Sequence, residues 1–358
     1  MYVAVPIGAL EKMKSQATIL DFTLAAIYLL VGAIISSPSH GLLLLICEVS
    51  LIVFVSLWPV TWFTEAPVLF GPSRSIEKAA ARKALEAPVA EEEPLTNDEL
   101  EAIAAAKRIV AKARAQFLAE NNGSVPMASL PAQKLASQGA DIFTKNLNPD
   151  ISAENKKWVS NYKDDAREVE IFSADFPGHP CKRWKVVATL RCDLETAYDA
   201  MFVPENRRVW DALVKDLKIL QINDCPPEVG DGLAITSIVT NQVVVVSSRS
   251  MLDIALQRCL KRGGITLVNV SIPSEYEETK LDPRAEGTVR ATTHIGSGAL
   301  IEPIKGRPGC LRYVLVSTIE LGGWLPPGVI NATMTTSLAQ STAQMQDFLI
   351  EKVKARGA

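Results

Sequence analysis

The residues that most often carry chemistry are few in this chain and lie far apart. Its histidines stand at positions 40, 179 and 294, and no two of its six cysteines form a Cys-x-x-Cys pair (Cys47, Cys181, Cys192, Cys225, Cys259 and Cys310). A metal site built from one local motif needs closer His and Cys spacing, so the sequence predicts no metal centre.

Catalytic motifs do not stand out either. We find no Gly-x-Ser-x-Gly motif, and no combination of nucleophile, base and orienting residue in the strand-like segments. We therefore expect neither an enzyme nor a cofactor. The net charge of −3 gives no reason to expect nucleic acid as a partner. Scattered cysteines are typical of reduced thiols in a cytosol-like compartment.

Two apolar runs near the N-terminus predict a membrane segment. They cover residues 22–36 and 42–63 and are separated by the turn sequence SPSHG. A bilayer core of about 30 Å needs roughly 20 helical residues, which the second run supplies and the first nearly does. The pattern favours a transmembrane helical hairpin over residues 18–63, preceded by a short cytosolic segment, residues 1–17.

Charges beside the hairpin indicate its orientation. Lys12 and Lys14 precede it, and four basic residues follow it (Arg74, Lys78, Arg82 and Lys83). Both flanks should therefore face the cytosol or an equivalent reducing compartment, as in a multi-pass protein of an intracellular organelle membrane. Alternatively, the first run is a cleaved signal. Glu48 lies inside the second run, where it is either protonated or in contact with a partner membrane protein.

The middle of the chain predicts a linker and a helix. Residues 64–97 are rich in Ala, Pro and Glu, which is typical of a linker. Thr96 and Glu99 have the spacing of a capping box, and Gly123 is a natural helix stop. We expect a spacer helix over residues 98–122 and a loose connecting segment over residues 123–149.

From about residue 150 to 358 the pattern is that of an α+β domain. Alternating segments predict strands near residues 168–174, 181–190, 217–223, 232–240, 251–260, 264–272, 288–296 and 312–321. Two short helices are expected after Asp193 and from Pro204, and a long helix from Pro326 to Lys354. A single helix laid across a curved antiparallel sheet encloses space, and such spaces host ligands.

The order of these segments resembles the START domain, the lipid-transfer module named after the steroidogenic acute regulatory protein. The resemblance spans about residues 165 to 355, and its strongest parts are GWLPPGVIN and the run from Val289 to Ile304. It implies a helix-grip fold in which the final helix covers a tunnel that holds one lipid.

The resemblance also implies ligand-binding residues. Arg258 aligns with a buried arginine that commonly pairs with an acid in the family tunnel, but Thr236 and Ser237 stand where that acid belongs. Asp253 should point to the other side of a regular strand and is a poor substitute. Five further residues are expected to line the tunnel: Asn269, His294, Ile330, Met334 and Leu338. The stripe formed by the last three also fits an ordinary core helix.

A lid is implied beside the final helix. Gly322, Gly323 and the pair Pro326–Pro327 would form its hinge. Trp324 and Pro326 would also belong to the lid and contact a membrane. The loop CLKRGG, residues 259–264, would place Lys261 and Arg262 at the tunnel mouth, where cations meet anionic headgroups. The same loop also fits a solvated hairpin turn.

Together these observations favour a membrane-anchored protein that binds or transfers one lipid, whether a sterol, a phospholipid or a sphingolipid. The alternative is a structural or regulatory subunit of a membrane protein complex that keeps the fold without transferring lipid, because a fold alone does not fix function.

Overall fold

A computed structural model describes residues 96–121, 125–242, 246–282, 287–323 and 327–357. The chain divides into two compact units, Met1–Glu91 and Glu92–Ala358, and the described residues belong to the second. The membrane hairpin expected at residues 18–63, Glu48, Trp324 and Pro326 all lie outside them. None of the helices in the described ranges is both long enough and apolar enough to cross a membrane.

The second unit is built on one large sheet whose spatial order is β1-β2-β3-β11-β10-β7-β6-β5-β4, with β8 paired to β6. All its neighbours are antiparallel except β6 and β8. The short strands β9 (Thr292–Thr293) and β12 (Ile319–Glu320) pair separately. The remaining strands are β1 (Val159–Asp164), β2 (Val169–Ala174), β3 (Arg183–Leu190), β4 (Val214–Asn223), β5 (Gly232–Thr240), β6 (Arg249–Cys259), β7 (Ile265–Ser271), β8 (Val289–Arg290), β10 (Ser297–Pro303) and β11 (Leu311–Ser317).

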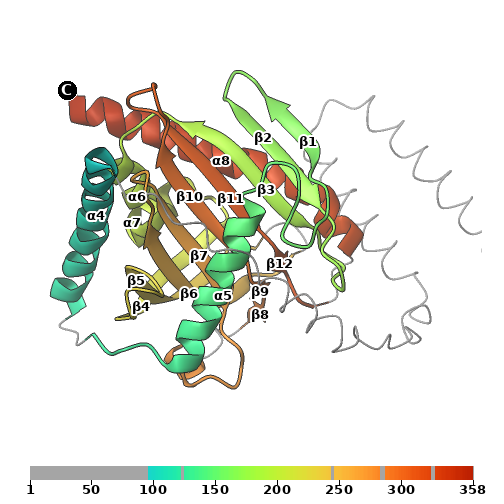
Figure 1. Ribbon diagram of the computed structural model, residues 1–358. Helices are drawn as coiled ribbons and strands as arrows, with labels where there is room; N and C mark the ends of the chain where they lie inside the picture. Colours follow the sequence, from blue (N-terminus) through green and yellow to red (C-terminus); the bar gives the residue numbers. More distant parts are fainter. Residues whose placement is uncertain (1–95, 122–124, 243–245, 283–286, 324–326, 358) are drawn as a thin grey trace, which may run out of the picture. The chain divides into compact units, whose positions relative to one another are not determined.

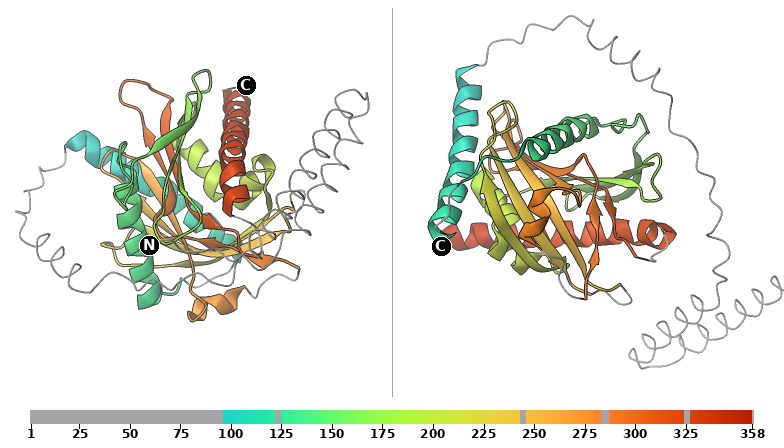
Figure 2. Two further views of the ribbon diagram at one scale, coloured as in Figure 1. Left: turned by 90° about the vertical axis from the view of Figure 1, so that its right-hand side faces the viewer. Right: turned by 90° about the horizontal axis from the view of Figure 1, so that it is seen from below.

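Helices cover both faces of this sheet (Figure 1). Helix α5 (Leu130–Asn146) packs its alanines against one face, here called the outer face, on residues such as Ile254 and Val268. Helix α8 (Pro327–Gly357) lies on the opposite, inner face, against β1, β2 and β3. Figure 2 shows α5 and α8 on opposite sides of the strands. Since both faces are covered, β6 is buried from Arg249 to Gln257.

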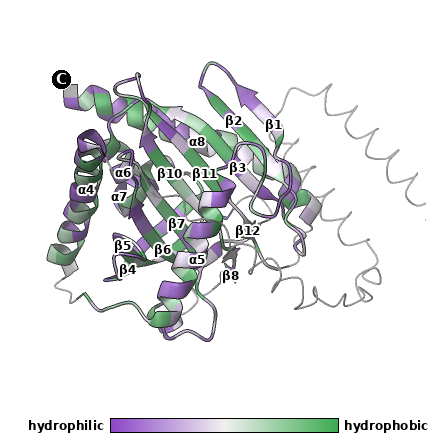
Figure 3. Ribbon diagram, viewed as in Figure 1, coloured by the Kyte–Doolittle hydropathy of each residue, from purple (hydrophilic) through white to green (hydrophobic). Residues whose placement is uncertain are grey.

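Three further helices complete the cover of the inner face. Helices α6 (Leu194–Phe202) and α7 (Pro204–Trp210) contact α8. Helix α4 (Asn97–Asn121) adds Ala106 and Val110 to the same apolar core as Met345 and Phe348 of α8. Figure 3 shows hydrophobic and hydrophilic residues mixed along α4 and α5, as expected for helices with one packed side.

The predicted capping box of α4 is confirmed. The Thr96 hydroxyl accepts from the Glu99 backbone N–H at 3.3 Å, and the Glu99 carboxylate accepts from the Thr96 N–H at 2.9 Å. The loose connecting segment expected over residues 123–149 is wrong in part, because α5 occupies Leu130–Asn146 with Ser129 as its N-cap. Both helices pack on the sheet unit, so α4 is more than a spacer.

Candidate functional site

The candidate site is the inner face of the sheet, and the strand register arranges its side chains in rows. Residues paired across antiparallel strands point to the same face. Thr236, Asp253 and Ser271 are paired across β5, β6 and β7 and form the first row. Two residues further along each strand, the second row holds Ala234, Ala255, Asn269 and Ser297.

The next rows are increasingly apolar. The third contains Gly232, Gln257, Leu267, Ala299, Leu315, Val186 and Ile171. The fourth contains Cys259, Ile265, Ile301, Tyr313, Ala188 and Val169. The inner face therefore runs from polar at the start of β6 to apolar at its end, and small side chains fill its middle.

Asp253 is the titratable group buried in the polar row. Its carboxylate accepts from the Ser271 hydroxyl at 2.7 Å and from the Thr293 hydroxyl at 2.8 Å. Burial raises the pKa of Asp253 to about 6, although both hydroxyl donors oppose the shift. A carboxyl group with such a pKa can accept or donate a hydrogen bond near neutral pH, which makes it a functional-site candidate.

Helix α8 supplies the opposite wall. Met334 and Leu338 pack against the inner-face core, and Ile330 continues their stripe at helical spacing. Met334 and Leu338 are only half-buried, as are Asn269, Ala299 and Leu315 on the strands. Ile330, Met345 and Leu349, nearer the two ends of the same stripe, are fully buried. The middle of the inner face is thus more accessible to water than the two ends of α8.

A pocket opens on the inner face between α4 and α6. It has about 230 Å³ of space, part of it open to solvent, and its walls include Phe202, Gly232, Ala234 and Gln257. Sites for small-molecule ligands usually hold about 300–1,000 Å³. This pocket by itself is too small for a whole lipid.

The structure contradicts the expectation that Arg258 and Ser237 face the interior. Arg258 lies on the outer face, where its Nε donates to the Val229 carbonyl at 2.7 Å and its guanidinium lies 3.6 Å from the Asp141 carboxylate of α5. The Ser237 hydroxyl is hydrogen-bonded to the Asp282 carboxylate on the same outer side. Alternation along β5 and β6 therefore leaves Thr236 and Asp253 inside.

The expected lid loop is also placed differently. The turn with Lys261 and Arg262 follows the last residue of β6 and packs against α4, where a Cβ on Gly263 would lie 2.8 Å from Ala102. The hinge lies at the other end of β6, because Arg249 donates to the Leu321 carbonyl at 2.7 Å. These ends are about 33 Å apart at the usual rise of a strand. Lys261 and Arg262 therefore do not share a mouth with the hinge.

The two glycines expected to form the hinge adopt a backbone conformation that favours glycine. Gly322 and Gly323 have φ angles of +64° and +74°, a region that side chains disfavour. A Cβ on Gly322 would lie 2.6 Å from the Arg290 carbonyl. Arg249 at the start of β6 lies beside the two glycines, so this end of β6, and not the CLKRGG turn, neighbours them.

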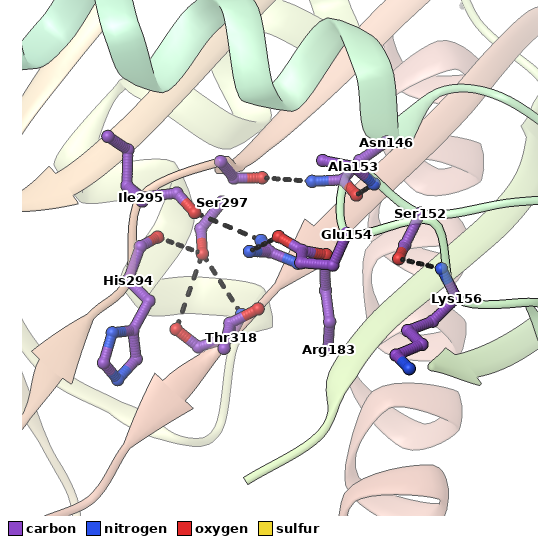
Figure 4. A network of polar contacts seen from close by, with 11 residues as sticks. Asn146, Ser152, Ala153, Glu154, Lys156, Arg183, His294, Ile295, Ser297 and Thr318 are labelled. Atoms are coloured by element: carbon purple, nitrogen blue, oxygen red, sulfur yellow. Dashed lines mark hydrogen bonds and ion pairs between the residues drawn. The ribbon is translucent and has the colours of Figure 1, made fainter. Parts of the chain in front are cut away.

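His294 lies at the edge of the site, in the turn between β9 and β10. Its backbone carbonyl accepts from the Ser297 hydroxyl at 2.7 Å, and Ser297 in turn accepts from the Thr318 N–H at 3.1 Å (Figure 4). Arg183 anchors the same turn by donating to the Ile295 carbonyl while paired with Glu154. The imidazole faces the β2–β3 loop, 4.4 Å from the ring of His179.

Comparison with known proteins identifies the class to which this fold and this interior belong. The family model of the START domain matches residues 144–354. The chain therefore belongs to the START domain family, and the helix-grip fold predicted from the sequence is confirmed.

Two curated relatives indicate the degree of similarity. The steroidogenic acute regulatory protein, mitochondrial, of Equus caballus is 27% identical over 129 residues, which are 35% of this chain and 40% of that protein. StAR-related lipid transfer protein 5 of Mus musculus is 26% identical over 142 residues, 39% of this chain and 61% of that protein. The chain thus spans about half the length of the curated relatives it matches.

A solved structure supports the same fold. Human StAR-related lipid transfer protein 5 matches with a TM-score of 0.53 and 19% sequence identity, over 62% of this chain and 97% of that one. At this identity the likeness concerns the fold alone.

Proposed function

We propose that this protein binds a single lipid between the inner face of the sheet and α8, and carries it between membranes. Membership of the START family supports this proposal. The observation that carries it is the gradient along the inner face, from the row of Thr236, Asp253 and Ser271 to the row of Ile265, Ile301 and Tyr313. An amphipathic ligand matches such a gradient end to end.

Binding needs no bond to be made or broken. The hydrocarbon part of the lipid would replace water against Leu267, Leu315 and Met334, which is favourable by about 25 cal/mol per Å² of apolar surface. The polar head would lie toward Asp253, Thr236 and Asn269, whose oxygens and amide can hydrogen-bond a hydroxyl or a carbonyl. A sterol or another lipid with a small uncharged head fits a buried carboxyl better than an anionic headgroup does.

The N-terminal region adds a proposed anchor. The apolar runs within residues 18–63 would hold the domain at an intracellular organelle membrane, with the START domain in the cytosol or an equivalent reducing compartment. Anchoring keeps the carrier at high effective concentration near its donor membrane. Glu48 would contact a partner membrane protein.

A second function is favoured by one observation. Arg258, which the family resemblance places in the tunnel, faces outward here, and this fits a domain that keeps the fold and supports a membrane complex without carrying lipid.

A vesicle assay separates the two functions. Residues 92–358 form one compact unit and can be mixed with donor vesicles containing fluorescent sterol or phospholipid and with unlabelled acceptor vesicles. A carrier moves label in proportion to its concentration. A folded protein that moves none of these lipids would leave only the supporting role.

A further inference from the structure

Two of the three histidines of this chain meet at one place although 115 positions separate them. His179 comes from the β2–β3 loop, His294 from the β9–β10 turn, and Glu320 from β12. One nitrogen or oxygen atom from each of these side chains lies within 4.8 Å of the corresponding atoms of the other two. The fold thus creates a cluster that the spacing in the sequence argued against.

The side chains of this cluster are held by their neighbours. The ring of Phe176 stacks on His179 at 4.3 Å between centroids, and Arg183 lies over Phe176 at 4.5 Å. The charge of Arg183 is paired with Glu154 at 2.8 Å. The Phe176 ring thus contacts both imidazoles, and the nearby Arg183 cation has its own partner.

His294 provides the observation that points to a ligand. Its Nε2 atom is buried and makes no hydrogen bond to any residue in the described part of the chain. Glu320 Oε2 lies 3.3 Å away, at ion-pair distance but without hydrogen-bond geometry. A buried polar atom is normally satisfied, so this nitrogen calls for a further partner.

We propose that His179, His294 and Glu320 bind one divalent transition-metal ion of the zinc class. Two imidazoles and one carboxylate are a common zinc ligand set. Metal–ligand distances of about 2.0–2.2 Å place tetrahedral ligand atoms roughly 3.3–3.6 Å apart. The 3.3 Å between His294 Nε2 and Glu320 Oε2 already falls within this range. The His179 side chain is exposed, so it can move to bring its ring nitrogen to the same spacing.

The metal would lie beside the first turn of α8. Asn331 accepts from the Lys182 N–H at 3.2 Å and donates to the Pro180 carbonyl at 3.3 Å, next to His179 in the chain. Glu320 directly precedes the segment that leads to the Gly322 hinge. A metal at this position ties together the two segments that flank the N-terminus of α8.

The test is a titration of the full chain, purified in detergent and stripped with a chelator, with Zn²⁺ alone. Calorimetry should show one Zn²⁺ per chain. His179→Ala and Glu320→Gln should each weaken binding by more than about tenfold, because even changes outside the ligand shell cost about 10–100-fold. His40→Ala and Cys181→Ala should bind as the wild type does.

Thermal unfolding provides a second readout. Zn²⁺ should raise the melting temperature of the wild type and of His40→Ala, but not that of His179→Ala, since only a ligand of the folded state stabilises it. Equal melting temperatures without metal would show that the variants fold. The proposal is overturned by the absence of one-to-one binding, by binding that persists in both cluster variants, or by binding lost only with Cys181.

Discussion

At the residue scale, the interior is defined by which side chains of β6 point inward. The sequence correctly indicated that Asp253 and Arg258 lie on opposite faces, because they are five positions apart on a strand. Which of the two faces inward could not be derived from alternation alone. The family resemblance favoured Arg258, whereas the Val229 carbonyl, Ser137 and Asp141 hold that side chain on the α5 face.

The buried carboxyl of Asp253 should make stability depend on pH. Its pKa is raised from 3.8 to about 6 in the folded protein. The stabilisation is therefore complete below the unfolded pKa and is lost as the pH rises through about 6, a change of roughly 3 kcal/mol at 1.36 kcal/mol per pKa unit. Urea unfolding across this window should show the loss in the wild type and not in Asp253→Asn. The exposed control Asp175→Asn should behave as the wild type, and equal pH profiles for all three proteins would contradict the assignment.

Arg258 should matter for stability and not for the ligand. Arg258→Leu removes three polar contacts to the α5 side and should lower the free energy of unfolding by about 1–3 kcal/mol. The amount of lipid bound per folded chain should stay unchanged. Loss of bound lipid with an unchanged free energy of unfolding would indicate that Arg258 faces the interior and contacts the ligand.

At the element scale, α8 and the glycines before it would control access to the interior of the proposed carrier. The sequence predicted the long helix and its stripe of Ile330, Met334 and Leu338, because helical periodicity is a local signal. The positive φ of Gly322 suits the glycine at the expected hinge, and the hinge itself stays a prediction.

The sequence patterns missed α5 and β10, and they placed the lid loop at the wrong end of β6. The error about the lid loop concerns which distant segments lie together, and no local pattern carries that information. Helix α5 was missed although Ser129 and Pro131 are local signals of a helix start.

Filling the space under α8 should displace the ligand. Met334→Trp adds a large ring on the half-buried side of the helix that packs on the inner-face core. Lipid occupancy should fall at least several-fold, while Thr336→Trp, on the exposed side of the same helix, should leave it unchanged. Similar occupancy in both variants would place the ligand elsewhere.

The contact of Asn331 with the β2–β3 loop should control how readily α8 opens. Asn331→Ala removes two hydrogen bonds to the backbone of Pro180 and Lys182, each worth about 1 kcal/mol. Stopped-flow release of a fluorescent lipid should become up to about 30-fold faster, since the two bonds total about 2 kcal/mol and 1.4 kcal/mol is a factor of ten in rate. An unchanged release rate would show that this end of α8 does not open.

At the scale of the whole molecule, each compact unit has its own proposed role: the first anchors the protein to a membrane, and the second binds the lipid. Deleting residues 1–91 should leave lipid binding by the second unit intact and abolish stable association with membranes, because the apolar runs lie in the deleted part. Flotation of the full chain and of the deletion variant with liposomes distinguishes them. Flotation of both proteins to the same extent would contradict the proposed anchor.

The central claim is that a lipid occupies the inner face between the polar row at Asp253 and α8. Native mass spectrometry of residues 92–358, purified from lipid-rich cells, tests it most directly. We predict one lipid per chain in the wild type and an empty Met334→Trp variant. A folded wild-type protein that carries no lipid would contradict the claim.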